Sequence, residues 1–425
     1  MEPRTTPAGA RDLGTVVLVQ ALRALLYGFG SVLLGASLAA AGLSDLEVGL
    51  VLTAMLTGFA LATVAVGAVG DRLGRRRTYR GLFLAMAAAG AVFALTDWLP
   101  ALLLAALTGT VSVEVSESGP LTSVEQAMIA QAAPTPEERN RAFARYNAVA
   151  YLAGSVGTLL AGGPDLFRAY VSALPANQRF LLAYPAVALA CAWLAGRLSP
   201  AVEAGGPGGR RLPLVRSRQR VAGLAALFAV DSLGGGFVVQ SFLVFWFRRR
   251  FGAPTELTAA LLFGAGLLQG ASSLAAGRLA SRIGLLNTMV FTHLPSNALL
   301  ALVPLAPSFP LAAATLLARF AISQMDVPAR QAYVVAIVDP EERTAAAAWT
   351  NAARYVARPA GPALGGWLMA AAGLGAPFVA AGALKAAYDL TLFAAFRRMV
   401  PHPAPEGGRP GGGPPGGGSA EGQPA

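Results

Sequence analysis

Two long apolar segments of the chain are joined by Gly67-Ala68-Val69-Gly70-Asp71-Arg72-Leu73-Gly74-Arg75-Arg76-Arg77. Glycine at three positions of this stretch allows close backbone approach and a tight turn. One negative charge, Asp71, lies among arginines at the boundary between apolar and polar sequence. The pattern indicates a short turn between two membrane-spanning helices, with its charges at the edge of the bilayer.

Composition places the chain among polytopic membrane proteins. Its 425 residues are 55% hydrophobic and 13% charged, and the mean hydropathy is +0.55. A soluble domain of this size rarely has so few charged residues. About 20 apolar residues are needed to cross a bilayer. Twelve apolar runs meet this requirement, near residues 14–41, 46–69, 79–97, 100–131, 143–163, 179–197, 221–247, 256–276, 286–306, 309–337, 344–371 and 374–396.

The second half of the chain repeats the first. A degraded copy of the opening stretch, 277–284, follows about 210 residues later, and Pro136-Glu137-Glu138-Arg139 recurs as 340–343 at an offset of about 205. The sequence therefore predicts an all-α membrane protein with twelve transmembrane helices in two pseudo-symmetric six-helix bundles. The expected parts are a cytoplasmic N-terminal tail (1–13), a first bundle (14–197), a cytoplasmic linker (198–220), a second bundle (221–398) and a disordered Gly/Pro-rich tail (399–425).

The opening stretch resembles the loop between helices 2 and 3 of major facilitator superfamily transporters of the bacterial type, G-x-x-x-D-R-x-G-R-[KR]-[KR]. The resemblance implies alternating access about a central cavity. It also implies a gating role for Gly67, Asp71, Arg72, Gly74 and Arg75, with Asp71 contacting the cytoplasmic end of helix 11 when the cavity faces outward. The G-P-x-x-G-G signature of drug antiporters is absent from helix 5 and occurs instead at 361–366, in helix 11. A multidrug cargo is therefore not indicated.

Arginine placement predicts the orientation. Most arginines outside the spans lie in segments on the side of the N-terminus, whereas the opposite loops hold only Arg168, Arg179, Arg248, Arg249 and Arg250. This asymmetry places both termini in the cytoplasm of a protein of the cell membrane. The net charge of +11 is thus an orientation signal and does not indicate nucleic-acid binding.

The sequence offers little for enzymatic chemistry. Cys191 is the single cysteine, and the two histidines, His293 and His402, lie in a helix and in the tail. We therefore expect no metal site, no cofactor and no enzyme activity, because no nucleophile–base or metal-ligand arrangement occurs.

Ionisable residues inside spans usually mark function. Arg23 and Asp231 are repeat equivalents of opposite charge, and so are Glu114 and Arg319. We expect the pairs Arg23–Glu114 and Asp231–Arg319 in the central cavity. Glu117 lies one helical turn after Glu114, so the two carboxylates are the preferred proton site. Two interpretations remain open: static ion pairs, or a carboxylate that takes up protons or exchanges its arginine for substrate.

Further polar residues suggest a gate and a binding surface. Glu125 and Arg330 are again equivalent and opposite. An inner gate is expected from Asp71 with Glu125, Asp326, Arg330, Arg354 and Arg358, the alternative being charges that extend to the lipid headgroups. Gln240 is expected to bind substrate or to hydrogen-bond a neighbouring helix. Lys385 and Asp389 are expected to pair within helix 12.

Local signals mark helix ends. Ser44-Asp45-Leu46-Glu47 predicts a capping box at the start of the second span. Gly234-Gly235-Gly236 is expected to loosen the seventh span.

The functional hypothesis is secondary active transport of a small solute by alternating access, as proton-coupled efflux. The alternatives are uptake or exchange of an organic anion, suggested by Arg23 and Arg319, and a non-transporting receptor or scaffold. The expected partners are a small-molecule substrate, protons and the lipid bilayer, and the chain is expected to be a monomer.

Overall fold

A computed structural model of the chain describes residues 7–115, 119–133, 136–168, 170–171, 176–203, 216–339 and 342–398. The tail at 399–425 and most of the linker lie outside the described residues. Helix α1 begins at Pro7, earlier than the predicted span. Its polar first turns are held to the end of the bundle by Asp12, whose Oδ1 accepts a hydrogen bond from the Ser199 backbone N at 3.0 Å.

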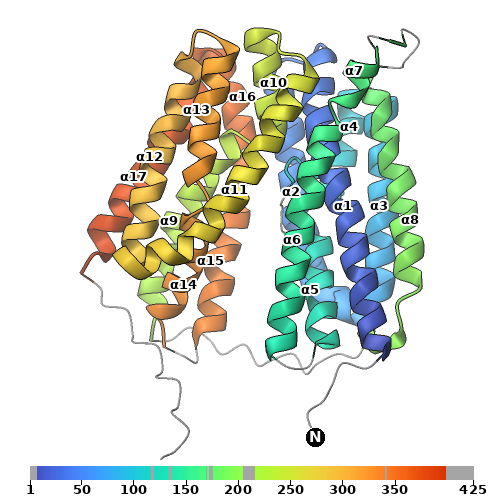
Figure 1. Cartoon of the computed structure of the whole chain (residues 1–425), viewed down its shortest axis with the longest axis vertical. Helices are drawn as coiled ribbons and strands as arrows, with labels where there is room; N and C mark the ends of the chain where they lie inside the picture. Colours follow the sequence, from blue (N-terminus) through green and yellow to red (C-terminus); the bar gives the residue numbers. More distant parts are fainter. Residues whose placement is uncertain are drawn as a thin grey trace, which may run out of the picture.

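Two helical bundles lie side by side (Figure 1). The first contains α1 (Pro7–Ala40), α2 (Asp45–Leu73), α3 (Arg75–Leu95), α4 (Leu99–Leu107), α5 (Pro120–Ala132), α6 (Pro136–Leu160), α7 (Gly163–Arg168), the 3₁₀ helix η1 (Asn177–Leu182), α8 (Ala183–Gly196) and η2 (Pro200–Glu203). The second contains α9 (Arg218–Phe237), α10 (Gln240–Phe251), α11 (Thr255–Ile283), α12 (Leu285–Leu302), η3 (Val303–Leu305), α13 (Phe309–Ile322), α14 (Asp326–Ala336), α15 (Arg343–Ala357), α16 (Ala360–Ala372) and α17 (Ala376–Phe396).

Within the described residues, eight helical segments are long and apolar enough to cross a membrane: Gly9–Ala40, Asp45–Gly70, Arg75–Leu95, Asn177–Gly196, Arg218–Phe251, Thr255–Ile283, Leu285–Leu305 and Ala376–Phe396. The other spans of the twelve are α4 with α5, α6, α13 with α14, and α15 with α16. Three of these are interrupted near their middle, which leaves pieces too short to cross alone, and α6 begins with a charged run. The predicted fold class is confirmed, and the interruptions are the feature that hydropathy did not reveal.

The repeat is visible in the backbone of its turns. Gly74 has φ +89° between α2 and α3, and Gly284 has φ +86° between α11 and α12. Side chains with a Cβ rarely adopt such angles, so glycine is required at both turns. The predicted capping box also forms, because the Ser44 hydroxyl accepts from the Glu47 backbone N at 3.3 Å and the Glu47 carboxylate accepts from the Ser44 backbone N at 2.8 Å.

Within each bundle, glycines at equivalent positions of the repeat let two helices approach closely. A Cβ on Gly28 of α1 would lie 2.0 Å from the carbonyl oxygen of Gly154 in α6. A Cβ on Gly236 of α9 would lie 2.3 Å from the carbonyl oxygen of Arg358, beside α16. Packing of small residues is the usual means by which membrane helices associate, because lipid tails supply no hydrophobic force between them.

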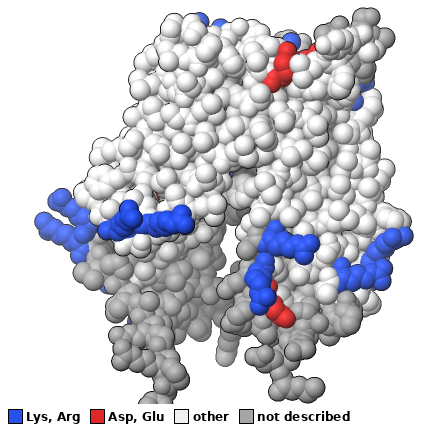
Figure 2. Space-filling view, in the orientation of Figure 1, with Lys and Arg blue, Asp and Glu red and all other residues white. Residues whose placement is uncertain are grey.

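The bundles meet at the end of the molecule away from Pro7 and Phe396 (Figure 1). A Cβ on Gly35 of α1 would lie 2.3 Å from the Ser241 carbonyl of α10, and one on Gly366 of α16 would lie 2.4 Å from the Asp45 carbonyl. The Thr53 hydroxyl accepts a hydrogen bond from the Ala363 backbone N at 2.9 Å. At the opposite end the bundles diverge and a cleft opens between them (Figure 2).

On the face drawn in Figure 2, charged side chains lie toward the two ends. The middle of this face lacks charged residues, and groups of arginine side chains lie toward the end where α1 begins. This apolar band is the part of the surface that suits a lipid environment.

Candidate functional site

In the first bundle, Arg23 of α1 pairs with Glu125 of α5, and their closest atoms, Nη2 and Oε2, are 2.6 Å apart. The Tyr79 hydroxyl of α3 donates to Glu125 Oε1 at 2.7 Å, and the Tyr146 hydroxyl of α6 donates to Oε2. Arg23 also donates to Gln20. Glu125 has no exposed surface and Arg23 is 3% exposed. Four helices are therefore connected through one sealed carboxylate.

The predicted pair of Arg23 with Glu114 was wrong, because Glu114 is not on a helix. Helix α4 ends at Leu107 and α5 begins at Pro120. Gly109 has φ +64°, and the Ser112 hydroxyl accepts from the Glu114 backbone N at 3.1 Å. Hydroxyl side chains that bond to the local backbone compete with helix formation.

Glu114 instead bridges the two bundles. Its Oε2 accepts a hydrogen bond from Nη2 of Arg358, the residue that follows α15. The Glu114 side chain is 25% exposed and that of Arg358 is 23% exposed. Both residues lie at interruptions of their spans, so the pair joins two points where the backbone departs from a helix. Glu117, the second carboxylate of the predicted proton site, lies outside the described residues.

Further polar contacts surround this bridge. The Val113 carbonyl accepts from the Ser241 backbone N at 3.2 Å, and the Ser241 hydroxyl donates to the Ser31 carbonyl at 2.9 Å. The Gln240 amide donates to the Ser31 hydroxyl at 3.0 Å. Gln240 therefore takes part in contacts between the bundles. This agrees with the alternative that Gln240 hydrogen-bonds to a neighbouring helix. Together these bonds connect the break in span 4 to the break between α9 and α10.

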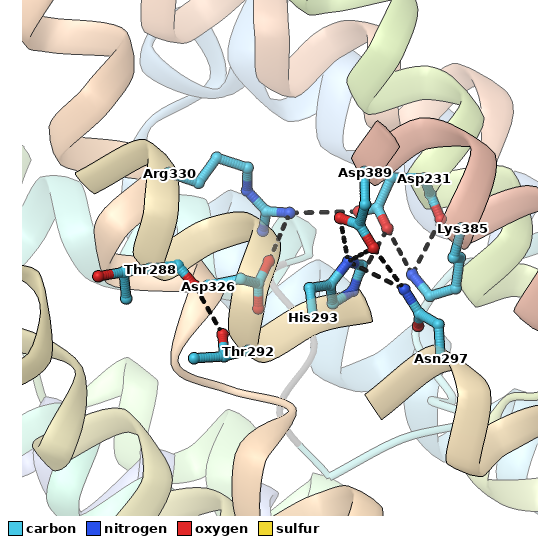
Figure 3. A network of polar contacts seen from close by, with 9 residues as sticks. All are labelled: Asp231, Thr288, Thr292, His293, Asn297, Asp326, Arg330, Lys385 and Asp389. Atoms are coloured by element: carbon cyan, nitrogen blue, oxygen red, sulfur yellow. Dashed lines mark hydrogen bonds and ion pairs between the residues drawn. The ribbon is translucent and has the colours of Figure 1, made fainter. Parts of the chain in front are cut away.

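The second bundle buries a larger polar network centred on Asp231 of α9 (Figure 3). Lys385 Nζ of α17 lies 2.5 Å from Asp231 Oδ1, and Arg330 Nη1 of α14 lies 3.2 Å from Oδ2. His293 of α12 contacts both Asp231 and Asp389. All of these side chains are buried.

Two further predicted pairings were therefore wrong. Among the described residues no ion pair joins Asp231 to Arg319, whose Nε is buried without a hydrogen-bond partner. Lys385 and Asp389 lie one turn apart, but they point to Asp231 and His293 respectively and not to each other. A buried charge without a partner is costly, so each buried charge pairs with an opposite charge in direct contact. Here those partners lie on other helices and not one turn away on the same helix.

Arg354 of α15 resembles Arg319. Its Nε is also buried without a hydrogen-bond partner in the described part of the chain. Both guanidinium groups lie within electrostatic range of Asp231 and Asp326, and Arg319 is also within range of Glu114. Two buried guanidinium groups thus lie near Asp231 and Asp326, each with an Nε that makes no hydrogen bond within the described residues.

The remaining gating residues lie at the end that carries the termini. The Asp71 side chain is outside the described part of the structure. Arg72 and Gly74 line a pocket of about 550 Å³ with Leu73, Arg76, Arg77, Arg80 and Glu203. The Glu203 carboxylate accepts from the backbone N of Arg75 at 2.6 Å and so caps α3, which begins there. Gly67 has no atom within 4 Å of a Cβ placed on it.

Three of the residues expected to form an inner gate, Glu125, Asp326 and Arg330, pair within their own bundle. Asp326 pairs with Arg330 one turn away on α14 at 3.2 Å, and Glu125 pairs with Arg23. Arg358 is bound to Glu114. In this conformation the described gate residues do not bridge the divergent end.

Sequence reasoning missed Tyr79, Tyr146, His293 and Asn297. A usable signal was present for His293, because an imidazole inside an apolar run requires a polar partner and Asp389 lies in another such run. No metal-holding group of three or more His, Cys, Asp or Glu side chains occurs among the described residues.

The sequence model of the Major Facilitator Superfamily matches residues 16–323 and 266–420. The Saccharomyces cerevisiae membrane protein YJR124C is 26% identical over an alignment of 423 residues, covering 91% of this chain and 94% of the yeast protein. This relative does not support the narrower expectation of a bacterial type.

Two solved structures have the same fold. The nucleoside transporter NupG matches with a TM-score of 0.70 and 14% identity, covering 91% of this chain and 100% of its own. A bacterial homolog of the human lysosomal transporter Spinster, in an inward-facing and occupied conformation, matches with a TM-score of 0.70 and 16% identity, covering 93% and 98%.

Proposed function

The chain belongs to the Major Facilitator Superfamily of secondary transporters, and within that family we propose that it moves a small organic solute out of the cell in exchange for protons. The single observation that carries this proposal is the ion pair of Glu114 and Arg358, which joins the two bundles at the interruptions of two spans. A contact that depends on one carboxylate being ionised gives protons control over whether the bundles stay joined.

Glu114 suits this role better than the other carboxylate of the first bundle. Glu125 has no exposed surface and is held by Arg23 and two tyrosine hydroxyls, so a proton has no route to it. Glu114 keeps a quarter of its side-chain surface exposed. Protonation of Glu114 removes the attraction to Arg358 and releases the guanidinium for substrate or for another partner.

The arginine distribution supports an orientation with both termini in the cytoplasm of the cell membrane, as the arginines toward that end in Figure 2 suggest. The bundles diverge at the same end, so this conformation corresponds to a cavity open to the cytoplasm. In such a cycle the Glu114–Arg358 pair is made while the cavity is open to the cytoplasm and is broken when it opens outward. We expect the protein to work as a monomer.

The test uses proteoliposomes that contain a pH-sensitive dye and carry an imposed proton gradient. Small cations, anions and neutral solutes are added in turn to the native chain, to Glu114→Gln and to Glu47→Gln. Glu47 is a matched control, because its glutamine variant keeps the capping box of α2 far from the cavity. Substrate-dependent proton flux that is lost only in Glu114→Gln supports the proposal. Full proton-driven transport by Glu114→Gln contradicts it.

A second candidate is transport of an organic anion. The buried, unpartnered Nε atoms of Arg319 and Arg354 favour it, since unmatched cations beside a cavity lower the free energy of an anionic solute. Competition by carboxylates, compared with the corresponding neutral amides, distinguishes this cargo from a neutral or cationic one. Loss of that preference in Arg319→Gln would support the anion, and equal competition by both classes would exclude it.

A further inference from the structure

The second bundle contains a buried histidine between two carboxylates. His293 Nδ1 lies 2.9 Å from Asp389 Oδ1 and 3.1 Å from Oδ2, and His293 Nε2 lies 3.7 Å from Asp231 Oδ1. Figure 3 shows the imidazole between the two aspartates. The residue is 5% exposed, and Asp389 has no exposed surface. The partners of the two ring nitrogens differ, and they indicate a role for each nitrogen.

The tautomer follows from the partners. An ionised carboxylate only accepts hydrogen bonds, so the nitrogen in contact with Asp389 carries a proton. Asn297 Nδ2 lies 2.9 Å from Asp389 Oδ2 and 3.1 Å from His293 Nδ1. Charge-assisted contacts of Nδ1 with both oxygens of Asp389 outweigh the contact with this neutral amide, so we assign the proton to Nδ1. Nε2 is then the atom with a free lone pair. That lone pair faces Asp231, and adding a proton there changes a repulsive contact into an attractive one.

The charge of the cluster favours the extra proton. Asp231, Asp326 and Asp389 supply three negative charges, whereas Arg330 and Lys385 supply two positive ones among the groups in direct contact. With a neutral imidazole, the groups in direct contact carry one net negative charge in a buried site, which is costly. An imidazolium makes the cluster neutral.

Two arginines act on this cluster at longer range and oppose protonation of the imidazole. They are Arg354 of α15 and Arg319 of α13. The Tyr388 ring of α17 packs edge-on against the imidazole, with 6.0 Å between ring centroids and an 85° angle between planes. Within the described part of the chain none of these groups hydrogen-bonds to the ring nitrogens, so the two aspartates in contact dominate.

We propose that Nε2 of His293 is a proton-binding site of the second bundle, and that its proton competes with Lys385 and Arg330 for the Asp231 carboxylate. Nε2 takes the proton from water, and no group of the cluster loses one. The His293, Lys385 and Arg330 side chains keep 7%, 8% and 6% of their surface exposed, so the protein does not enclose the cluster completely.

The proton also has a mechanical consequence. Arg330 lies on α14, the second piece of an interrupted span, and its contact with Asp231 holds that piece to α9, whereas Asp326 pairs with Arg330 within α14. An imidazolium that satisfies Asp231 weakens the hold of α9 on α14. This link to transport rests on the proposed function, whereas proton binding by His293 does not.

The chain offers a direct measurement, because His293 and His402 are its only histidines. The full chain with His402→Ala, labelled with ¹⁵N-histidine and carrying no histidine tag, is reconstituted in liposomes for solid-state NMR without substrate or gradient. Between about pH 5 and 9, where imidazoles ordinarily change charge, Nδ1 is expected to stay protonated while Nε2 gains a proton as the pH falls. An Nε2 that stays unprotonated throughout, or a neutral form protonated at Nε2, overturns the proposal.

Variants test whether the ¹⁵N signal of His293 depends on the charged residues around it. Asp389→Asn removes a negative charge in contact with the ring and is expected to weaken proton binding at least about tenfold. Thr292→Val is the matched control, since the Thr292 hydroxyl donates only to the Thr288 carbonyl one turn away. An Asp389→Asn titration identical to that of the control contradicts the assignment. Glu114→Gln is expected to leave the titration of His293 unchanged. A negative result for Glu114 in the transport test therefore does not decide whether His293 binds a proton, and the reverse also holds.

Discussion

The ion pair between Glu114 and Arg358 is expected to stabilise the conformation that is open at the end of the termini. It is formed in this conformation and joins the two bundles. Replacing Glu114 by glutamine removes the charge and keeps the shape of the side chain. The expected result is a shift of the population toward the conformation closed at that end.

The magnitude follows from exposure. A fully exposed ion pair contributes up to about 1 kcal/mol, and a buried charged hydrogen bond contributes about 1.5–3 kcal/mol. With 25% and 23% of their surfaces exposed, Glu114 and Arg358 lie between these cases. We take about 1–2 kcal/mol, which corresponds to a factor of about 5–30 in the equilibrium between the two conformations.

Distances between spin labels measure this equilibrium. Leu73 and Ile283 are repeat equivalents at the open end, with 59% and 38% exposure, and cysteines at these positions accept labels. The native Cys191 is fully buried, which keeps labelling selective. All variants are compared at one fixed pH. In Glu114→Gln the short-distance population between positions 73 and 283 should rise by the factor given above.

A double-mutant cycle isolates the pair, because Arg358 makes further interactions that Arg358→Gln would also remove. The charge-swapped variant Glu114→Arg with Arg358→Glu is expected to restore much of the native distribution. If Glu114→Gln leaves the distance distribution unchanged, or if the swap restores nothing, the pair does not control the equilibrium and the reasoning is refuted.

Three further predictions concern stability, each measured as thermal unfolding in detergent. Glu125→Gln is expected to cost about 3–5 kcal/mol, since it leaves Arg23 buried without its counter-charge; an unchanged midpoint would contradict this. Gly157→Ala places a Cβ 1.9 Å from a backbone carbonyl of α1 and should cost about 1–3 kcal/mol, whereas Gly81→Ala meets nothing within 4 Å and should be neutral. Burial alone would raise the pKa of Asp165, but hydrogen bonds with Thr255 and Asn177 and the nearby Arg168 outweigh it and hold the pKa below its ordinary value of 3.8. The stabilisation is therefore fully present above about pH 4 and is lost as the pH falls through the folded-state pKa, a loss that Asp165→Asn should not show.

Features that depend on local sequence or on simple length were predictable. Twelve apolar runs predicted twelve spans, because crossing a bilayer imposes a length that few other structures share. The turn at Gly74 and its equivalent at Gly284 were predictable because a positive φ nearly requires glycine. The capping box at Ser44 involves residues three apart and depends on no tertiary contact. The loosening expected at Gly234–Gly236 corresponds to the break that follows Phe237.

The pairing of buried charges was only half predictable. Sequence comparison of the repeats indicated that Arg23 and Asp231 are equivalent, as are Glu125 and Arg330. The structure pairs Arg23 with Glu125 and Asp231 with Arg330, so each bundle uses the same two positions with the signs exchanged. Glu114 was chosen as the partner of Arg23 on the assumption of a continuous helix. The break that follows Leu107 involves the hydrogen bond from the Glu114 backbone N to the Ser112 hydroxyl and the contact of Val113 with the other bundle, which hydropathy does not register.

The exchange of signs gives the bundles different properties. In the first bundle the carboxylate is Glu125, and two of its partners are tyrosine hydroxyls, which remain neutral donors at any physiological pH. In the second bundle the carboxylate is Asp231, and its partners are an arginine, a lysine and an imidazole on three different helices. Several cations that compete for one carboxylate can change partners when a proton arrives, whereas neutral hydroxyls fixed on one carboxylate cannot. We infer that the first bundle is the rigid half and that response to protons within a bundle is concentrated in the second, with Glu114 acting between them.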